Sequence, residues 1–216
     1  MKNNNSTWHS EILPAESTAV LNELHKKISL SQFYLAGGTG LALILGHRLS
    51  NDFDFFNKEL FNEEALLQNL QGLKNLSVIS KEEHTLHINL NGIKVSFLGY
   101  NYPLLFPVKQ YKFEKELSIN VADERDIACM KISAIGSRGI KRDFIDLYMT
   151  AQKYSLSELF KLFVKKFSLT PYNNVHILKS LTYFEDANKE PMPEMLVTLK
   201  WEKIKQYFNS VVSQLL

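Results

Sequence analysis

The sequence predicts an α+β fold, in which strands and helices come first and helices alone follow. The clearest strand signal spans residues 86–98, where apolar and polar side chains alternate on either side of Asn91-Gly92. That pair is favoured in two-residue hairpin turns, because both positions take a positive φ. From Asp123 onward the apolar residues recur with helical spacing instead. We therefore expect an α/β core over residues 1–122 and a helical region over residues 123–216.

Further elements of the core are predicted from the same patterns. Residues 1–14 are expected to be flexible. Thr39 is expected to cap a short helix, because a threonine hydroxyl can accept a free N–H of the first turn. The other predicted elements are a helix at 15–29, a strand at 33–36, the capped helix through 45, a strand at 51–56, a helix at 62–71 and a strand at 117–121.

The helical region is predicted to contain five helices. Asp123 is expected to cap the first of them, and Pro191 and Pro193 mark a loop before the last. The helices are expected at 123–135, 141–153, 155–167, 172–184 and 194–213.

The composition fits a packed globular protein and excludes several functional classes. Apolar residues make up 45% of the chain and charged residues 22%. No run approaches the roughly 20 apolar residues of a membrane-spanning helix, and the N-terminal residues have no signal-peptide pattern. We therefore expect a cytoplasmic protein with no membrane partner. Cys129 is the single cysteine, which excludes an intramolecular disulfide and a multi-cysteine zinc site.

Charge gives a weaker indication of the partner. The net charge of +2 does not by itself indicate nucleic acid. One tight basic cluster is formed by Arg138, Lys141 and Arg142. It indicates either a phosphate-facing edge or a solvated helix surface, and the sequence favours neither.

Two carboxylates, Asp52 and Asp54, flank Phe53 on the second predicted strand. Residues two apart on a strand point to the same face, so both carboxylates would converge while Phe53 turns into the core. Adjacent carboxylates repel unless a cation lies between them, and hard oxygen ligands with open positions suit Mg²⁺. The alternative is a solvated strand end.

A glycine turn, Gly37-Gly38-Thr39, lies between a predicted strand and a predicted helix. Glycines let the backbone approach a phosphate closely, and a helix N-terminus directs free N–H groups at it. The alternative is an ordinary tight turn. The chain has no G-x-x-x-x-G-K-[ST] motif, so this turn is not a P-loop.

The order and spacing of these two features are more specific than either feature alone, because thirteen residues separate Gly38 from Asp52. The arrangement resembles the polymerase-beta-like nucleotidyltransferase superfamily. The segment YLAGGTGLALILGHRLSNDFDFF is similar to the AbiEii-type toxin family, the nucleotidyltransferase halves of toxin–antitoxin and phage-defence pairs. The similarity resumes at IKVSFLGYNYPLL and DIACMKISAIGSRGIKRDFIDLY and is looser at LKSLTYFEDA and PMPEML. It implies a polymerase-beta-like core with a small mixed sheet, followed by a helical region that completes the active site.

The resemblance implies roles for further residues. Lys131 lies within the apolar arc of its predicted helix, where it either snorkels outward or points into a polar site. The family's third motif is a helical lysine expected to contact nucleotide phosphates, which favours the polar site. Asp146, fifteen residues later, is the better candidate for a functional carboxylate. Asp143 shares its helix side, or is an N-terminal charge favoured by the helix dipole. Arg48 and Ser50 match family positions that would touch phosphate, and an exposed loop arginine is the alternative.

The sequence departs from the superfamily at one position. Polymerase-beta-like enzymes generally place a third carboxylate on a neighbouring strand, where it binds metal and accepts a proton, but this chain has Ser96 there. Serine is neither a base near neutral pH nor a strong Mg²⁺ ligand. A two-residue turn would place His87 opposite Ser96, and histidine is a competent base near pH 7. Asp146 is the other candidate for this role, and a structural His87 is the alternative.

Together these features predict a Mg²⁺-dependent nucleotidyltransferase that transfers NMP from an NTP to an acceptor. The resemblance implies that the acceptor is tRNA and that a cognate antitoxin protein is a partner. Two alternatives stay open: a small molecule or protein as acceptor, and a module that binds a nucleotide or partner without turnover.

Overall fold

The computed structural model describes residues 8–114, 117–170 and 172–215 of the 216-residue chain. The chain divides into two compact units. The sheet unit comprises Met1–Gly46, Ser50–Pro103 and Pro107–Asp123, and the helical unit comprises His47–Leu49, Leu104–Phe106 and Glu124–Leu216. No helix within the described ranges is long and apolar enough to cross a membrane.

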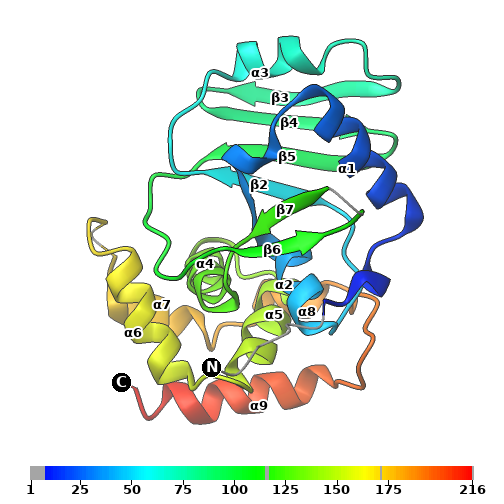
Figure 1. Cartoon of the computed structure of the whole chain (residues 1–216). Coiled ribbons are helices and arrows are strands. Elements are labelled where there is room, and N and C mark those ends of the chain that lie inside the picture. The colour runs from blue at the N-terminus through cyan, green and yellow to red at the C-terminus, as the bar shows by residue number, and fades with distance from the viewer. Residues whose placement is uncertain (1–7, 115–116, 171, 216) are drawn as a thin grey trace, which may run out of the picture. The chain divides into compact units, whose positions relative to one another are not determined.

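Among the described residues of the sheet unit, seven strands form one mixed sheet in the order β3-β4-β5-β2-β1-β7-β6 (Figure 1). β2 runs parallel to β5 and β1 runs parallel to β7, whereas the other neighbours are antiparallel. The strands are β1 (Tyr34–Leu35), β2 (Phe53–Asn57), β3 (Leu76–Glu82), β4 (Thr85–Leu90), β5 (Ile93–Gly99), β6 (Lys109–Lys112) and β7 (Ser118–Val121). The mixed sheet confirms the predicted α+β fold.

The hairpin of β4 and β5 is built as the sequence predicts. Asn91 and Gly92 take φ values of 53° and 85°, the positive values that a type I′ turn requires. The resulting register pairs His87 with Ser96, as expected.

The sequence missed β3 and β6, which are the two edge strands of the sheet. Val78 and Ile79 of β3 are both exposed, at 46% and 53%. Two neighbouring exposed apolar residues break the alternation by which a half-buried strand is detected.

The core of the sheet unit lies on one face of the sheet, with α1 (Ala15–Lys27) and α3 (Glu63–Leu70) packed into it. Phe55 is fully buried and stacks between Phe53 and Phe97, at ring distances of 6.0 and 5.6 Å. Because strand side chains alternate, Asp54 of β2 and Ser96 of β5, which lie next to these aromatics along the chain, face away from the core. Residues 1–7 of the segment expected to be flexible lie outside the described residues, and Ile12 and Leu13 from the rest of it are buried in this core.

The helix α2 (Gly37–Leu45) follows β1 and begins three residues earlier than expected. Its N-cap is Ala36, so Thr39 lies in the first turn and the prediction that Thr39 is the cap is wrong. The physical reason is the positive φ of Gly37, +63°, which turns the chain directly from the strand into the helix.

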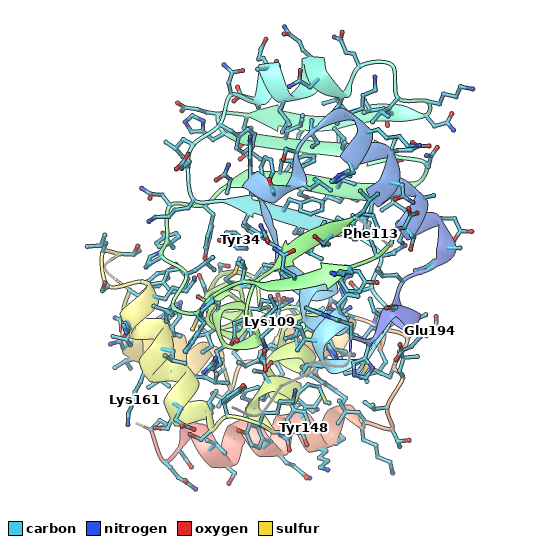
Figure 2. The ribbon with its side chains drawn as sticks, viewed as in Figure 1. Tyr34, Lys109, Phe113, Tyr148, Lys161 and Glu194 are labelled. Carbon is cyan, nitrogen blue, oxygen red and sulfur yellow. The ribbon has the colours of Figure 1, made fainter. Side chains whose placement is uncertain are left out.

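The helical unit contains α4 to α9 around an aromatic core. Phe144 is fully buried and meets Trp201 and Phe208 edge-on. Tyr148, labelled in Figure 2, follows one turn later and meets Tyr207 edge-on at 5.2 Å. The helices are α4 (Glu124–Ser137), α5 (Lys141–Ala151), α6 (Leu156–Lys166), α7 (Asn174–Ser180), α8 (Glu185–Lys189) and α9 (Trp201–Val212).

Two predicted helices are shorter in the structure. The helix expected at 172–184 ends at Ser180, and the one expected at 194–213 begins at Trp201. Residues 194–196 are not helical, and their backbone groups pair with residues 47–49 through bonds of 2.9 and 3.0 Å. Such long-range pairing leaves no mark in local periodicity.

Candidate active site

The carboxylate pair lies at the start of β2 in the sheet unit. β2 begins at Phe53, so Asp54 lies in the strand and Asp52 immediately precedes it. Both aspartates are partly exposed, whereas Phe53 between them is fully buried. The alternation of side chains along the chain thus leaves two carboxylates accessible while it anchors their backbone in the core.

Gly37 lies against the carboxylate of Asp54. A Cβ at this position would come 2.7 Å from Asp54 Oδ2, and the φ of +63° is one that L-residues rarely adopt. Glycine is therefore needed here for both space and backbone conformation. Because α2 begins at Gly37, its first N–H groups have no acceptor within the helix. They are donors for an anion close to Asp54.

Thr39 fastens the loop that carries Asp52. Its hydroxyl donates to the backbone carbonyl of Asp52 and lies 2.8 Å from Ser50 Oγ. The Thr39 side chain is buried. The side chains of Thr39 and Ser50 thus hold the backbone that carries Asp52.

The pairing of three strands brings Asp54, Ser96 and His87 into one row. Asp54 is the partner of Ser96 across β2 and β5, and Ser96 is the partner of His87 across β5 and β4. Ser96 is 1% exposed, and its Oγ lies 2.9 Å from His87 Nδ1. Burial, and then the charge of Lys94, lower the pKa of His87, whereas Asp54 and Glu82 act more weakly in the opposite direction. His87 is therefore neutral near pH 7.

The donors around Asp54 suit a cation that is shared with a ligand. Within the described residues, no group of three or more His, Cys, Asp or Glu side chains could hold a metal ion. Asp52 and Asp54 supply two carboxylates, and Ser96 occupies the neighbouring position. The two carboxylates fit a hard divalent cation that completes its shell with water and substrate phosphates.

A second group of charged residues lies in the helical unit and is almost closed to solvent. Asp146 accepts hydrogen bonds from Nε and Nη2 of Arg48, at 2.7 and 2.9 Å, and its Oδ1 is 2.8 Å from His47 Nε2. Lys131 Nζ lies 2.8 Å from Asp143 Oδ1 and 2.7 Å from Asp146 Oδ2. All five side chains are buried. We call them the ionic cluster.

Mutual attraction keeps Asp146 and Lys131 charged inside the ionic cluster. Burial opposes ionisation of Asp146, but Lys131 and then Arg48 outweigh it and hold the pKa of Asp146 well below its usual range. Burial also opposes the charge of Lys131, and Asp146 and Asp143 outweigh it, so the pKa of Lys131 is raised. Each charge thus depends on its partners, because an uncompensated buried charge is strongly destabilising.

The basic residues predicted to cluster have separate environments. Arg138 Nε donates to Asp143 Oδ2 at 2.9 Å. Lys141 is buried and donates to the backbone carbonyl of Glu190, whereas Arg142 is exposed. The three side chains therefore do not form a continuous basic edge.

Comparison with known proteins assigns the chain to a family. The family model described as "Nucleotidyl transferase AbiEii toxin, Type IV TA system" matches residues 19–214. The chain belongs to the AbiEii family. It is 39% identical over 203 residues to an uncharacterized protein of Aquifex aeolicus. The match covers 89% of this chain and 94% of the relative.

Two solved structures share the fold of this AbiEii chain. MenT4, a nucleotidyltransferase toxin of Mycobacterium tuberculosis, gives a TM-score of 0.52 at 16% identity, over 92% of this chain and 85% of its own. A candidate nucleotidyltransferase of H. pylori gives a TM-score of 0.50 at 16% identity, over 93% of this chain and 95% of its own. The polymerase-beta-like fold is thereby confirmed, and the family assignment makes the chain a nucleotidyltransferase. Nucleotidyltransferases of this kind generally use a divalent metal.

In the AbiEii chain, two residues predicted to bind phosphate, Lys131 and Arg48, form hydrogen bonds and ion pairs within the ionic cluster. Lys131 points into a polar site, but that site consists of Asp143 and Asp146. The third nitrogen of Arg48, Nη1, donates to the carbonyl of Leu49 at 3.1 Å. A phosphate that bound Lys131 or Arg48 would have to compete with these acceptors. Phosphate contacts by the two residues therefore stay predictions.

Sequence reasoning missed His47 in this cluster. His47 directly precedes Arg48 and is fully buried, and its partner Asp146 is 99 residues away. The position of His47 beside Arg48 was the available sign of a functional role. However, a single histidine at the end of an apolar run has no residue spacing that indicates its partner Asp146.

Proposed function

We propose that this AbiEii nucleotidyltransferase uses Asp52 and Asp54 to bind Mg²⁺ and an NTP, and transfers NMP to an RNA acceptor of the tRNA type. The observation that carries the proposal is the contact of the Gly37 turn with the Asp54 carboxylate, 2.7 Å from where a Cβ would be. It brings the accessible carboxylate of Asp54 next to the N-terminus of a helix, and Thr39 of the same helix bonds the backbone of Asp52.

Each part of this site has a separate task in the proposal. Asp52 and Asp54 would hold the cation, which when bound neutralises charge on the triphosphate. The backbone N–H groups of Gly37, Gly38 and Thr39 bind phosphate oxygens at the helix N-terminus. Thr39 and Ser50 fix the loop of Asp52, so catalysis rests on positioning and electrostatics, as in phosphoryl transfer generally.

The direct test is incubation with each α-³²P-labelled NTP, Mg²⁺ and total tRNA. Label should move onto tRNA with the wild type and not with the Asp52→Ala/Asp54→Ala variant. Asp186→Ala, which removes an exposed carboxylate of the helical unit, is the matched control and should transfer label normally. Transfer by the double variant, or transfer to protein or a small molecule but not to tRNA, would refute this version of the proposal.

The proposed biological role is that of the toxin in a toxin–antitoxin or phage-defence pair, with a cognate antitoxin as partner. The family description supports this role, because it names a toxin of a type IV system. Expression of the wild type alone should slow growth, and Asp54→Ala should relieve the effect. Equal toxicity of the two proteins would contradict the proposal.

A second candidate is a module that binds nucleotide without turnover. The observation that favours it is Ser96, which stands beside Asp54 where the superfamily generally has a third carboxylate. Saturable binding of Mg²⁺ and NTP, with no pyrophosphate released in the presence of any acceptor, would favour this candidate over the enzyme.

A further inference from the structure

The row formed by Asp54, Ser96 and His87 raises the question of what replaces the third carboxylate. Ser96 is directly beside Asp54 in the sheet, and His87 is directly beside Ser96 on the other side. Ser96 is 1% exposed, whereas His87 is partly exposed. A ligand at Asp54 would therefore meet the imidazole as the next group in this row that can bind a proton.

We propose that His87 accepts the proton of the attacking hydroxyl during nucleotidyl transfer, and that Ser96 orients its imidazole. This inference rests on the proposed function and deepens it, because it names a catalytic base at the same site. It takes Ser96 as a positioning residue, and leaves binding of the cation to Asp52 and Asp54.

The hydrogen bond between His87 and Ser96 determines which imidazole nitrogen is available. Ser96 Oγ lies 2.9 Å from Nδ1. When Nδ1–H donates to this oxygen, Nε2 carries the free lone pair and acts as the acceptor of a proton. The superfamily generally has a carboxylate base at the position of Ser96. Here a neutral imidazole would take that role, so no further negative charge is added beside Asp54.

The charges around His87 suit a base that is neutral before reaction. Burial and Lys94 of β5 lower the pKa of His87, while Asp54 of β2 and Glu82 of β3 favour the imidazolium. The base is therefore ready to accept a proton at neutral pH. The carboxylates of Asp54 and Glu82 partly stabilise the charge that His87 gains.

The step balances without any further reactant. The acceptor hydroxyl oxygen forms a bond to the α-phosphorus of the NTP, and the bond from that phosphorus to the bridging oxygen breaks. Pyrophosphate leaves with the bond electrons, and the hydroxyl proton moves to Nε2 of His87. Water regenerates the neutral imidazole after product release.

A first experiment examines the free protein and does not depend on activity. In ¹⁵N NMR spectra at neutral pH, His87 should be the Nδ1–H tautomer, and Ser96→Ala should shift its population towards Nε2–H. A wild-type His87 that is Nε2–H, with Nδ1 accepting from Ser96, would overturn the orientation that the proposal requires.

The kinetic experiment compares wild type, His87→Ala, His87→Gln and the control His176→Gln, which changes an exposed histidine of the helical unit. Loss of general-base catalysis should lower kcat by about 10²–10⁴-fold, with little change in KM for the NTP. The rise of wild-type kcat with pH, through a pKa below the usual histidine value, should disappear in both His87 variants. His176→Gln should match the wild type.

The variant Ser96→Asp supplies the rescue. It restores a carboxylate beside Asp54, so Ser96→Asp/His87→Gln should recover kcat relative to His87→Gln and should bind Mn²⁺ more tightly. A kcat for His87→Gln within about threefold of the wild type would overturn the proposal while the proposed function stands. An inactive wild type that binds NTP would overturn both. Thermal unfolding of each variant, and the wild-type pH profile, exclude misfolding as the cause.

Discussion

Asp54 and Asp146 are both carboxylates on regular elements, and their surroundings differ in nearly every respect. Asp146 is fully buried and contacts Arg48, His47 and Lys131. Asp54 is partly exposed, and a glycine turn keeps the space beside it open. A buried carboxylate whose oxygens accept hydrogen bonds from protein donors stabilises the fold. A carboxylate whose oxygens are accessible can bind a ligand.

The difference shows that two charged residues of the motif, Lys131 and Arg48, have acceptors within the protein, and their phosphate contacts stay predictions. Lys131 and Arg48 match motif positions, yet each neutralises aspartates of its own unit. Substitutions that separate stability from activity can test this contrast.

The largest effect is expected for Asp146→Ala. The substitution leaves the buried charges of Arg48 and Lys131 without their common partner, so it should lower the free energy of unfolding by about 3–5 kcal/mol. Urea unfolding followed by circular dichroism measures this change. Asp186→Ala, which removes an exposed carboxylate, should change it by less than about 0.5 kcal/mol. Equal small losses for both variants would show that the ionic cluster does not stabilise the fold.

Asp54→Asn should have the opposite profile. It removes a negative charge that the proposed cation needs, so the transfer rate should fall by at least about 10²–10³-fold. The free energy of unfolding should change by less than about 0.5 kcal/mol, because the side chain is partly exposed. Radiolabel transfer and urea unfolding of the same preparation give both values. A stable variant with normal transfer would place the catalytic metal elsewhere.

Gly37→Ala should affect both properties at once, because its Cβ meets Asp54 Oδ2 and its φ is +63°. We expect a stability loss of about 1–2 kcal/mol from the left-handed backbone, together with at least tenfold slower transfer. Gly92→Ala is the matched control, since its φ is +85° and a Cβ there meets nothing within 4 Å. It should show similar strain and normal transfer. If both variants are equally active, the close approach to Asp54 has no function.

The smallest effect is the pH dependence of stability due to Asp146. Its pKa is lower in the folded protein than the unfolded value of about 3.9. The stabilisation is therefore complete above that value and is lost as pH falls below it, by at most about 1.4 kcal/mol per pH unit. Urea unfolding of wild type and Asp146→Asn between pH 7 and pH 3 measures it. Parallel curves for the two proteins would contradict the assigned pKa direction.

Local patterns predicted the parts of the fold that depend on local structure. The Asn91-Gly92 turn fixed the register that pairs His87 with Ser96, and the Gly37 turn was correctly placed between a strand and a helix. The edge strand β3 escaped because Val78 and Ile79 are both exposed.

The contacts of the candidate site were harder to predict than its residues. The sequence indicated Lys131 and Asp146 as chemically important, but their mutual contact depends on how α4 and α5 pack. The role of His47 depends on a partner 99 residues away. Such distances are set by tertiary packing, which leaves no periodic signal in one sequence.

Nucleotide binding tests the central claim, that the open carboxylates of the sheet unit hold the metal and nucleotide, most directly. Calorimetric titration with the α,β-methylene analogues of the four NTPs, with and without Mg²⁺, measures it. We predict one Mg²⁺-dependent site that is absent in Asp52→Asn/Asp54→Asn, with the melting temperature of that variant unchanged. Wild-type affinity in a correctly folded double variant would contradict the claim.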